Sequence, residues 1–71
     1  MKKLELAKKI GENIKRIRKK LGITQAELAR RCFKDKQAME KIENGKVNPT
    51  AYSLYQVAKA LNTDPADLWK L

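Results

Sequence analysis

The sequence predicts an all-α fold, built as a compact bundle of five short helices in a single domain of residues 1–71. Apolar residues recur at spacings of three and four along most of the chain, and no segment shows the strict alternation of a β-strand. Helix start and stop residues divide the chain into five segments of helical length. A domain this small buries only about 60% of its unfolded surface, so a modest free energy of unfolding is expected.

The first helix is predicted over residues 3–20. Its apolar stripe is formed by Ala7, Ile10, Ile14, Ile17 and Leu21. Gly11 weakens this helix by about 1 kcal/mol relative to alanine. Gly22 is expected to end it in a left-handed conformation, because glycine adopts a positive φ without a Cβ clash.

The second and third helices are predicted over residues 25–32 and 36–43. Thr24 and Glu27 have the spacing of a capping box, in which each side chain accepts from the backbone N–H of the other residue. Asp35 is expected to cap the third helix, and Gly45 to end it. The two helices are separated by only a few residues, which predicts a tight turn.

The last two helices are predicted over residues 51–61 and 65–70. Thr50 is expected to cap the fourth helix, whose apolar residues Leu54, Val57, Ala58 and Leu61 share one face. Asn62 is expected to stop it. Asp64 followed by Pro65 is a typical start for the short fifth helix.

Polar residues form a second stripe on the third helix, away from its apolar face. This polar stripe consists of Lys36, Gln37, Glu40, Lys41 and Asn44. Residues 1–46 carry fifteen basic and six acidic side chains, whereas residues 47–71 carry two of each. The net charge of +9 therefore belongs entirely to the part that contains the stripe, which favours a polyanionic partner over charge that serves only solubility.

Several functional classes are disfavoured by composition. The chain contains no histidine, no glycine-rich phosphate loop, and no serine or cysteine with a neighbouring base, so neither an enzyme nor a metal or other cofactor is expected. Cys32, the single cysteine, cannot form an internal disulfide. The chain has neither a signal peptide nor an apolar run long enough to span a membrane, and a cytoplasmic location is expected.

Four motifs, QAELA, KIENGK, NPT and VAKAL, occur in this order and at the spacing typical of one family. The chain resembles the phage-repressor and Cro-type (Xre) helix-turn-helix proteins from about Ile10 to Leu68. The resemblance implies a lambda-repressor-like fold and double-stranded operator DNA as the partner. It also implies an ion pair between Arg18 and Glu43, which we expect to be bidentate and partly buried.

The resemblance also implies which side chains face DNA. Base contacts are expected from Lys36, Gln37, Ala38, Glu40 and Lys41, and a phosphate contact from Gln25. From their own position, in a loop with free donors after the third helix, Asn44, Lys46 and Asn48 are expected to contact phosphates too, as is Lys34. Lysine suits the acceptors of guanine, and glutamine can pair with adenine. The carboxylate of Glu40 could accept from cytosine, or it could orient Lys36 one turn away.

Two residues depart from the family pattern. Most members have glycine or a small polar residue where Phe33 stands, and a small apolar residue where Lys34 stands. A bulky residue in a left-handed conformation is energetically unfavourable. Either this turn has another geometry or packing holds Phe33 in place, and the exit angle of the third helix depends on the answer.

The predicted function is sequence-specific regulation of transcription, with a repressor that acts as a dimer as the preferred form. Trp69, in the fifth helix, is expected to contribute to a weak homodimer that spaces two third helices about 34 Å apart on a palindromic operator. The main alternative is an antitoxin or other protein-interaction module, with a toxin or polymerase partner. A basic amphipathic helix lying on a membrane would leave the well-capped later helices unexplained.

Overall fold

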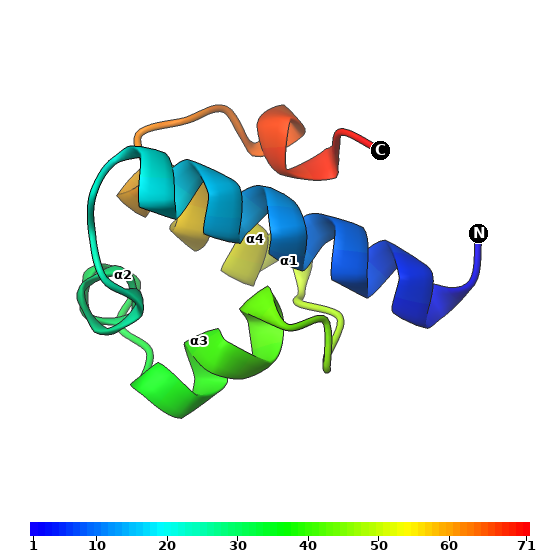
Figure 1. Ribbon diagram of the computed structural model, residues 1–71, viewed down its shortest axis with the longest axis horizontal. Coiled ribbons are helices and arrows are strands. Elements are labelled where there is room, and N and C mark those ends of the chain that lie inside the picture. The colour runs from blue at the N-terminus through cyan, green and yellow to red at the C-terminus, as the bar shows by residue number, and fades with distance from the viewer.

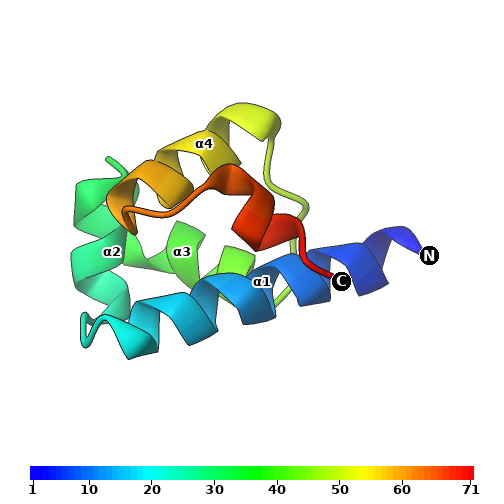
Figure 2. The same ribbon diagram turned by 90° about the horizontal axis from the view of Figure 1, so that it is seen from above.

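The computed structural model describes all residues from Met1 to Leu71 and contains no strand. Its elements are, in order, α1 (Lys3–Lys20), α2 (Gln25–Arg31), α3 (Lys36–Glu43), α4 (Ala51–Ala60) and the 3-10 helix η1 (Pro65–Trp69). The long α1 runs across the bundle, with α3 packed against it on one side and η1 on another, and α2 packs against α3 (Figures 1 and 2). The all-α class and the bounds of the first four helices agree with the prediction to within a residue.

The fifth element corrects the prediction of five α-helices. Pro65–Trp69 forms a single 3-10 turn, in which the N–H of Asp67 donates to the carbonyl of Asp64 at 2.8 Å. Five residues leave little room for a series of α-helical hydrogen bonds. The Leu68 carbonyl of this turn and the Lys70 carbonyl just after it accept from the Asn13 side chain of α1, whose Nδ2 lies 3.0 Å from the Leu68 oxygen and 2.8 Å from the Lys70 oxygen.

Side-chain caps begin each of the three middle helices, as predicted. The backbone N–H groups of Glu27, Ala38 and Ser53 donate to the side chains of Thr24, Asp35 and Thr50 at 3.0, 2.7 and 3.0 Å. The reciprocal half of the predicted capping box is wrong. The Glu27 carboxylate instead pairs with the guanidinium groups of Arg30 at 2.6 Å and Arg31 at 2.9 Å, because both arginines lie within one turn on the same side of α2.

All four α-helices end in the same way, with a left-handed residue just beyond the last turn. These residues are Gly22 (φ 73°), Phe33 (φ 59°), Gly45 (φ 70°) and Asn62 (φ 55°). At the end of α2, the N–H of Lys34 donates to the carbonyl of Ala29 at 2.9 Å, which is the bond that defines a Schellman motif. Phe33 therefore does adopt the unfavourable conformation, yet its side chain is 90% exposed, so packing does not hold it there.

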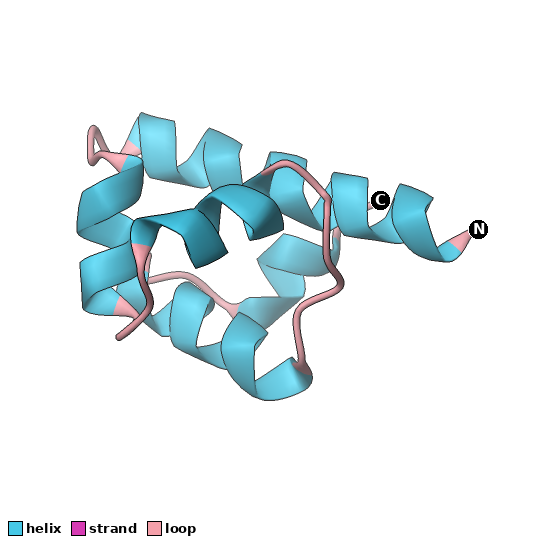
Figure 3. Ribbon diagram, turned by 90° about the horizontal axis from the view of Figure 1, so that it is seen from below, coloured by secondary structure: helices cyan, strands magenta, loops and turns pink.

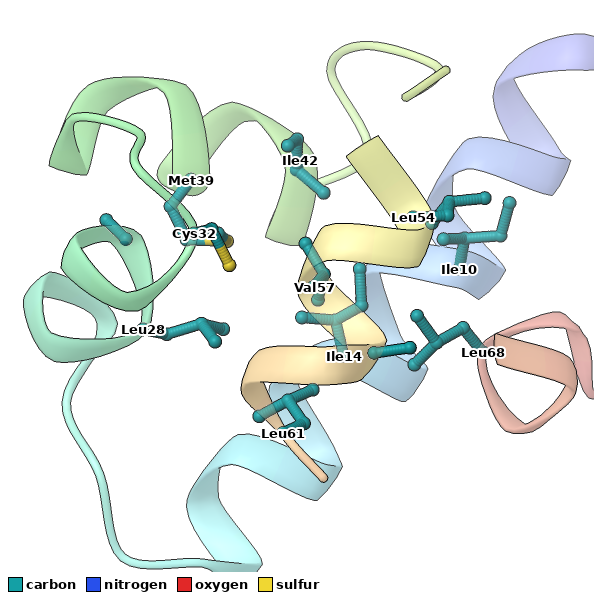
Figure 4. Packing of buried hydrophobic residues seen from close by; sticks show 12 residues of the cluster. Ile10, Ile14, Leu28, Cys32, Met39, Ile42, Leu54, Val57, Leu61 and Leu68 are labelled. Atoms are coloured by element: carbon teal, nitrogen blue, oxygen red, sulfur yellow. The ribbon is translucent and has the colours of Figure 1, made fainter. Parts of the chain in front are cut away.

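The core is one cluster of buried side chains contributed by every element (Figure 4). Its members are Ile10, Ile14, Leu28, Ala29, Cys32, Met39, Ile42, Leu54, Val57, Ala58, Leu61 and Leu68. Leu68 brings η1 into contact with α1 and α4, so the short fifth element is part of the core and closes it.

Two glycines allow α1 to lie against the end of α3. A Cβ added to Gly11 would come within 2.5 Å of the Glu43 backbone oxygen and 2.6 Å of that of Ile42. A Cβ on Gly45 would come within 2.6 Å of the Lys8 side chain. Gly11 thus has a packing role that offsets its low helix propensity, and this close approach fixes α3 relative to α1.

Candidate nucleic-acid interface

The polar stripe of α3 faces solvent along the edge of the bundle. The helix buries Met39, Ile42 and Glu43 on one side and leaves Lys36, Gln37 and Lys41 exposed on the other. Ala38 and Glu40 are half-buried at the borders. Figure 3 shows α3 in front of the other helices, with no later segment of the chain covering it. The residues predicted to contact bases are therefore accessible to a partner of the size of a duplex.

Two shallow grooves flank α3 and make it a ridge. The first, of about 660 Å³, lies between α3, the second half of α1 and the start of α2. Its lining includes Lys15, Lys19, Gln25, Lys36 and Asn44. The second, of about 380 Å³, lies on the other side, and its lining includes Lys34, Gln37, Lys41, Asn48 and Ser53. A protruding helix with lysines in both flanking grooves has the shape and charge that suit a duplex.

Glu40 is the centre of a small hydrogen-bond network beside the stripe. Its Oε1 atom accepts from Lys46 Nζ at 2.8 Å and from Asn44 Nδ2 at 2.9 Å, and Asn44 Oδ1 in turn accepts from Lys15 Nζ at 3.3 Å. These contacts, first that of Lys46 and then that of Asn44, hold the pKa of Glu40 below its ordinary value. The suggestion that Glu40 orients Lys36 is wrong, because its carboxylate turns toward the loop that follows α3.

A buried ion pair joins α1 to α3, as expected for Arg18 and Glu43. Arg18 donates from Nε to Glu43 Oε2 at 2.6 Å and from Nη2 to Oε1 at 3.1 Å, so the pair is bidentate. The Glu43 side chain is fully buried. Arg18 Nη1 also donates to the Ile23 carbonyl at 3.0 Å. The pair therefore connects α1, the α1–α2 turn and the end of α3.

Gln25 adds α2 to this buried network. Its Nε2 donates to Glu43 Oε1 at 3.1 Å, which holds the amide at the start of α2 beside the first groove. The bond to Glu43 fixes the orientation of the Gln25 side chain beside this groove. Sequence reasoning did not anticipate this bond, because it assigned Gln25 to phosphate and paired Glu43 with Arg18 alone.

The other residues predicted to contact phosphate lie on both sides of α3. Asn44 and Lys46 are exposed, and Asn48 is half-buried beside the second groove. Lys34 is half-buried, and its ammonium donates to Ser53 Oγ at 3.1 Å, which ties the α2–α3 turn to α4. Lys15 and Lys19 were not among the predicted contacts. The two lysines are four residues apart, which was the available signal, because this spacing places them on one face of α1.

The structure contains no group of three or more histidine, cysteine or acidic side chains placed to hold a metal ion. Burial raises the pKa of the Cys32 thiol, which keeps it protonated and consistent with a packing role. None of the helices is both long enough and apolar enough to cross a membrane.

Comparison with known proteins identifies the family. The helix-turn-helix family profile matches residues 14–68, which include the α2–α3 pair and most of the core. The chain belongs to the helix-turn-helix family. This confirms the resemblance to the Xre and Cro-type proteins that the sequence motifs indicated.

Relatives of this helix-turn-helix chain occur in bacteria and archaea. An uncharacterised HTH-type transcriptional regulator, y4dJ, of Sinorhizobium fredii is 34% identical over 92% of this chain and 84% of its own length. An uncharacterised HTH-type transcriptional regulator of Archaeoglobus fulgidus is 34% identical over 79% of this chain and 80% of its own length.

Solved structures support the same fold. The restriction-modification controller protein C.AhdI of Aeromonas hydrophila superposes with a TM-score of 0.90 at 24% identity, covering 96% of this chain and 99% of that one. The clp gene regulator ClgR of C. glutamicum superposes with a TM-score of 0.86 at 25% identity, covering 89% and 82%.

Proposed function

We propose that this protein is a sequence-specific double-stranded DNA-binding regulator of transcription, in which α3 enters the major groove. The observation that carries the proposal is the exposed polar stripe of α3 between two lysine-lined grooves. Membership of the helix-turn-helix family and relatives named as transcriptional regulators support the same function. The major groove admits a helix and presents a distinct donor and acceptor pattern for each base pair.

The base-contacting role belongs to Lys36, Gln37 and Lys41, whose side chains are exposed on the ridge, with Ala38 and Glu40 beside them. Lysine ammonium groups suit guanine O6 and N7, and the amide of Gln37 suits adenine N6 and N7. Because Glu40 Oε1 is engaged by Lys46 and Asn44, its second oxygen, Oε2, is the candidate acceptor for a cytosine amino group.

Phosphate contacts come from the two sides of α3. Gln25, Asn44 and Lys46 contact the DNA backbone that lies beside the first groove of the protein. Lys34 and Asn48 contact the DNA backbone that lies beside the second. Lys15 and Lys19 add positive charge to the first groove. Such contacts set the position of the protein on the duplex without distinguishing sequences directly.

The protein acts as a homodimer in this proposal, through η1 and the α4–η1 turn. Trp69 is 47% exposed on η1, which leaves a large apolar surface available to a second copy. Two α3 helices about 34 Å apart would meet successive major grooves on one face of a palindromic site and block polymerase by occupancy. Sedimentation that gave a monomer both free and on operator DNA would refute the dimer.

Selection from random duplex DNA tests the function, with a palindromic motif as the expected result. On the selected site, Lys36→Ala or Gln37→Ala should cost about 1–3 kcal/mol and relax the preference at one base pair. Lys46→Ala is the matched control, because it should weaken binding to all sequences about equally. Affinity should fall steeply with salt as phosphate contacts release counterions. If all three variants retain full affinity for duplex DNA, the assignment of α3 is wrong.

A further inference from the structure

A second surface, separate from the polar stripe, carries exposed aromatic side chains. Phe33, Tyr52 and Tyr55 are 90%, 68% and 51% exposed, and all three line one groove of about 500 Å³ between the end of α2 and α4. We call this the aromatic groove, and its lining is completed by Arg31, Cys32, Gln56, Lys59 and Ala60. The two helices that form it lie side by side at one end of the bundle (Figure 2).

Phe33 contributes nothing to the fold that would explain its presence. It occupies the left-handed position that Gly22, Gly45 and Asn62 occupy at the other helix ends, where a bulky side chain is unfavourable. Its ring is almost fully exposed, so no burial offsets that strain. Backbone strain that the fold does not repay is concentrated at functional sites, and here it presents an aromatic ring at the rim of an apolar groove.

The charge around the groove indicates the chemistry of its occupant. Arg31 and Lys59 line it, and no carboxylate does. Arg31 shares the single Glu27 carboxylate with Arg30, so a net positive charge remains at this rim. The Lys59 ammonium lies 5.9 Å from the centre of the Tyr55 ring, which is stacked on Tyr52 at 6.4 Å. The chain carries seventeen basic against eight acidic side chains, so most of the surface of a second copy does not complement this basic rim. An acidic partner would be attracted, and the apolar interior suits an aliphatic or aromatic side chain.

We propose that the aromatic groove binds a short acidic segment of another protein, with an aliphatic or aromatic side chain of that segment seated between Phe33 and the two tyrosines. Aromatic residues around a pocket are the common centre of protein interfaces. The Tyr52 and Tyr55 rings are stacked on each other and Lys59 lies over Tyr55, which leaves less ring face free for stacked nucleotide bases and favours a peptide. The groove shares no lining residue with the polar stripe, so the protein can hold DNA and this partner together.

Selection of peptides from a random twelve-residue display library tests the proposal. The library is selected on the wild-type protein after depletion on Phe33→Gly, which removes the ring and keeps the left-handed turn. The depletion step removes acidic peptides that bind only through overall charge. Enriched peptides should be net acidic and contain a large apolar residue. Their binding should fall tenfold or more in Phe33→Gly and stay unchanged in Leu4→Ser, a control that removes another exposed apolar side chain, far from the groove.

Nuclear magnetic resonance with a selected peptide and with a dT12 oligonucleotide locates the binding site. The peptide should shift the resonances of Phe33, Tyr52 and Tyr55, and both variants should keep the duplex affinity of the wild type. The proposal is overturned if no acidic peptide survives the depletion, if the peptide shifts map to Lys36 and Lys41, or if dT12 alone occupies the groove. If the wild type forms a dimer and Phe33→Gly does not, the proposal is overturned, because the groove would then bind a second copy of this chain. A negative result in these peptide experiments would not contradict DNA binding by α3. A negative result in the duplex selection would not contradict peptide binding in the aromatic groove.

Discussion

Replacement of Phe33 by glycine should stabilise the protein. Phe33 adopts φ 59° at the end of α2, where three other helix ends use glycine or asparagine. A left-handed conformation costs an L-residue about 1–2 kcal/mol, and glycine avoids this cost. Glycine loses more conformational freedom on folding than other residues, and this loss cancels about 0.4–1 kcal/mol of the gain.

Removal of the Phe33 ring lowers the free energy of unfolding only slightly. Phe33 is 90% exposed, so only a tenth of its surface is removed from water on folding. Complete burial of a phenylalanine is worth about 2–3 kcal/mol, and a tenth of that is about 0.2–0.3 kcal/mol. The net gain in the free energy of unfolding is therefore about 0.5 kcal/mol, which raises the melting temperature of a domain this size by about 2–4 °C.

Thermal unfolding followed by circular dichroism at the helix band measures this change. The matched control is Phe33→Ala, which removes the ring but keeps a Cβ in the left-handed conformation. It should melt close to the wild type and below Phe33→Gly. If Phe33→Gly melts at or below Phe33→Ala, then the left-handed backbone of Phe33 is not strained, and the proposed gain in stability is refuted.

Three further changes test the packing and electrostatics. Arg18→Ala or Glu43→Ala should each cost about 3–5 kcal/mol in urea unfolding by leaving a buried charge unpaired, and the double variant Arg18→Met with Glu43→Leu should cost less than either. Gly11→Ala should lower stability by about 1–2 kcal/mol despite its better helix propensity, because the new Cβ meets two backbone oxygens, and a stabilised variant would disprove that contact. The pKa of Glu40 is lower in the folded protein than in the unfolded chain. The contribution of this carboxylate to stability is therefore complete above the unfolded pKa and disappears as the pH falls through the folded pKa. Glu40→Gln should therefore show a smaller loss of stability than the wild type between pH 5 and about pH 3, and identical acid titrations would contradict this.

The candidate interface was predictable in outline because helix periodicity alone places Lys36, Gln37 and Lys41 on one face and Met39 and Ile42 on another. The side-chain hydrogen bonds made by the same helix could not be predicted from the sequence. Glu40 could reach a lysine one turn away on α3 or a residue in the following loop, and both lie within range of a flexible side chain. Only the path of the chain after α3 places Lys46 2.8 Å from its carboxylate.

The bounds of the four α-helices, and the face of each that is apolar, follow from the order of the amino acids alone. Thr24, Asp35 and Thr50 cap helices through contacts only three residues long, and such local interactions are present in the sequence before any packing. The contact of Gly11 with the end of α3, and the exposed position of Phe33 beside two tyrosines of α4, become visible only in the folded protein. Those facts depend on residues brought together from distant parts of the chain, and their positions are set by how the helices pack.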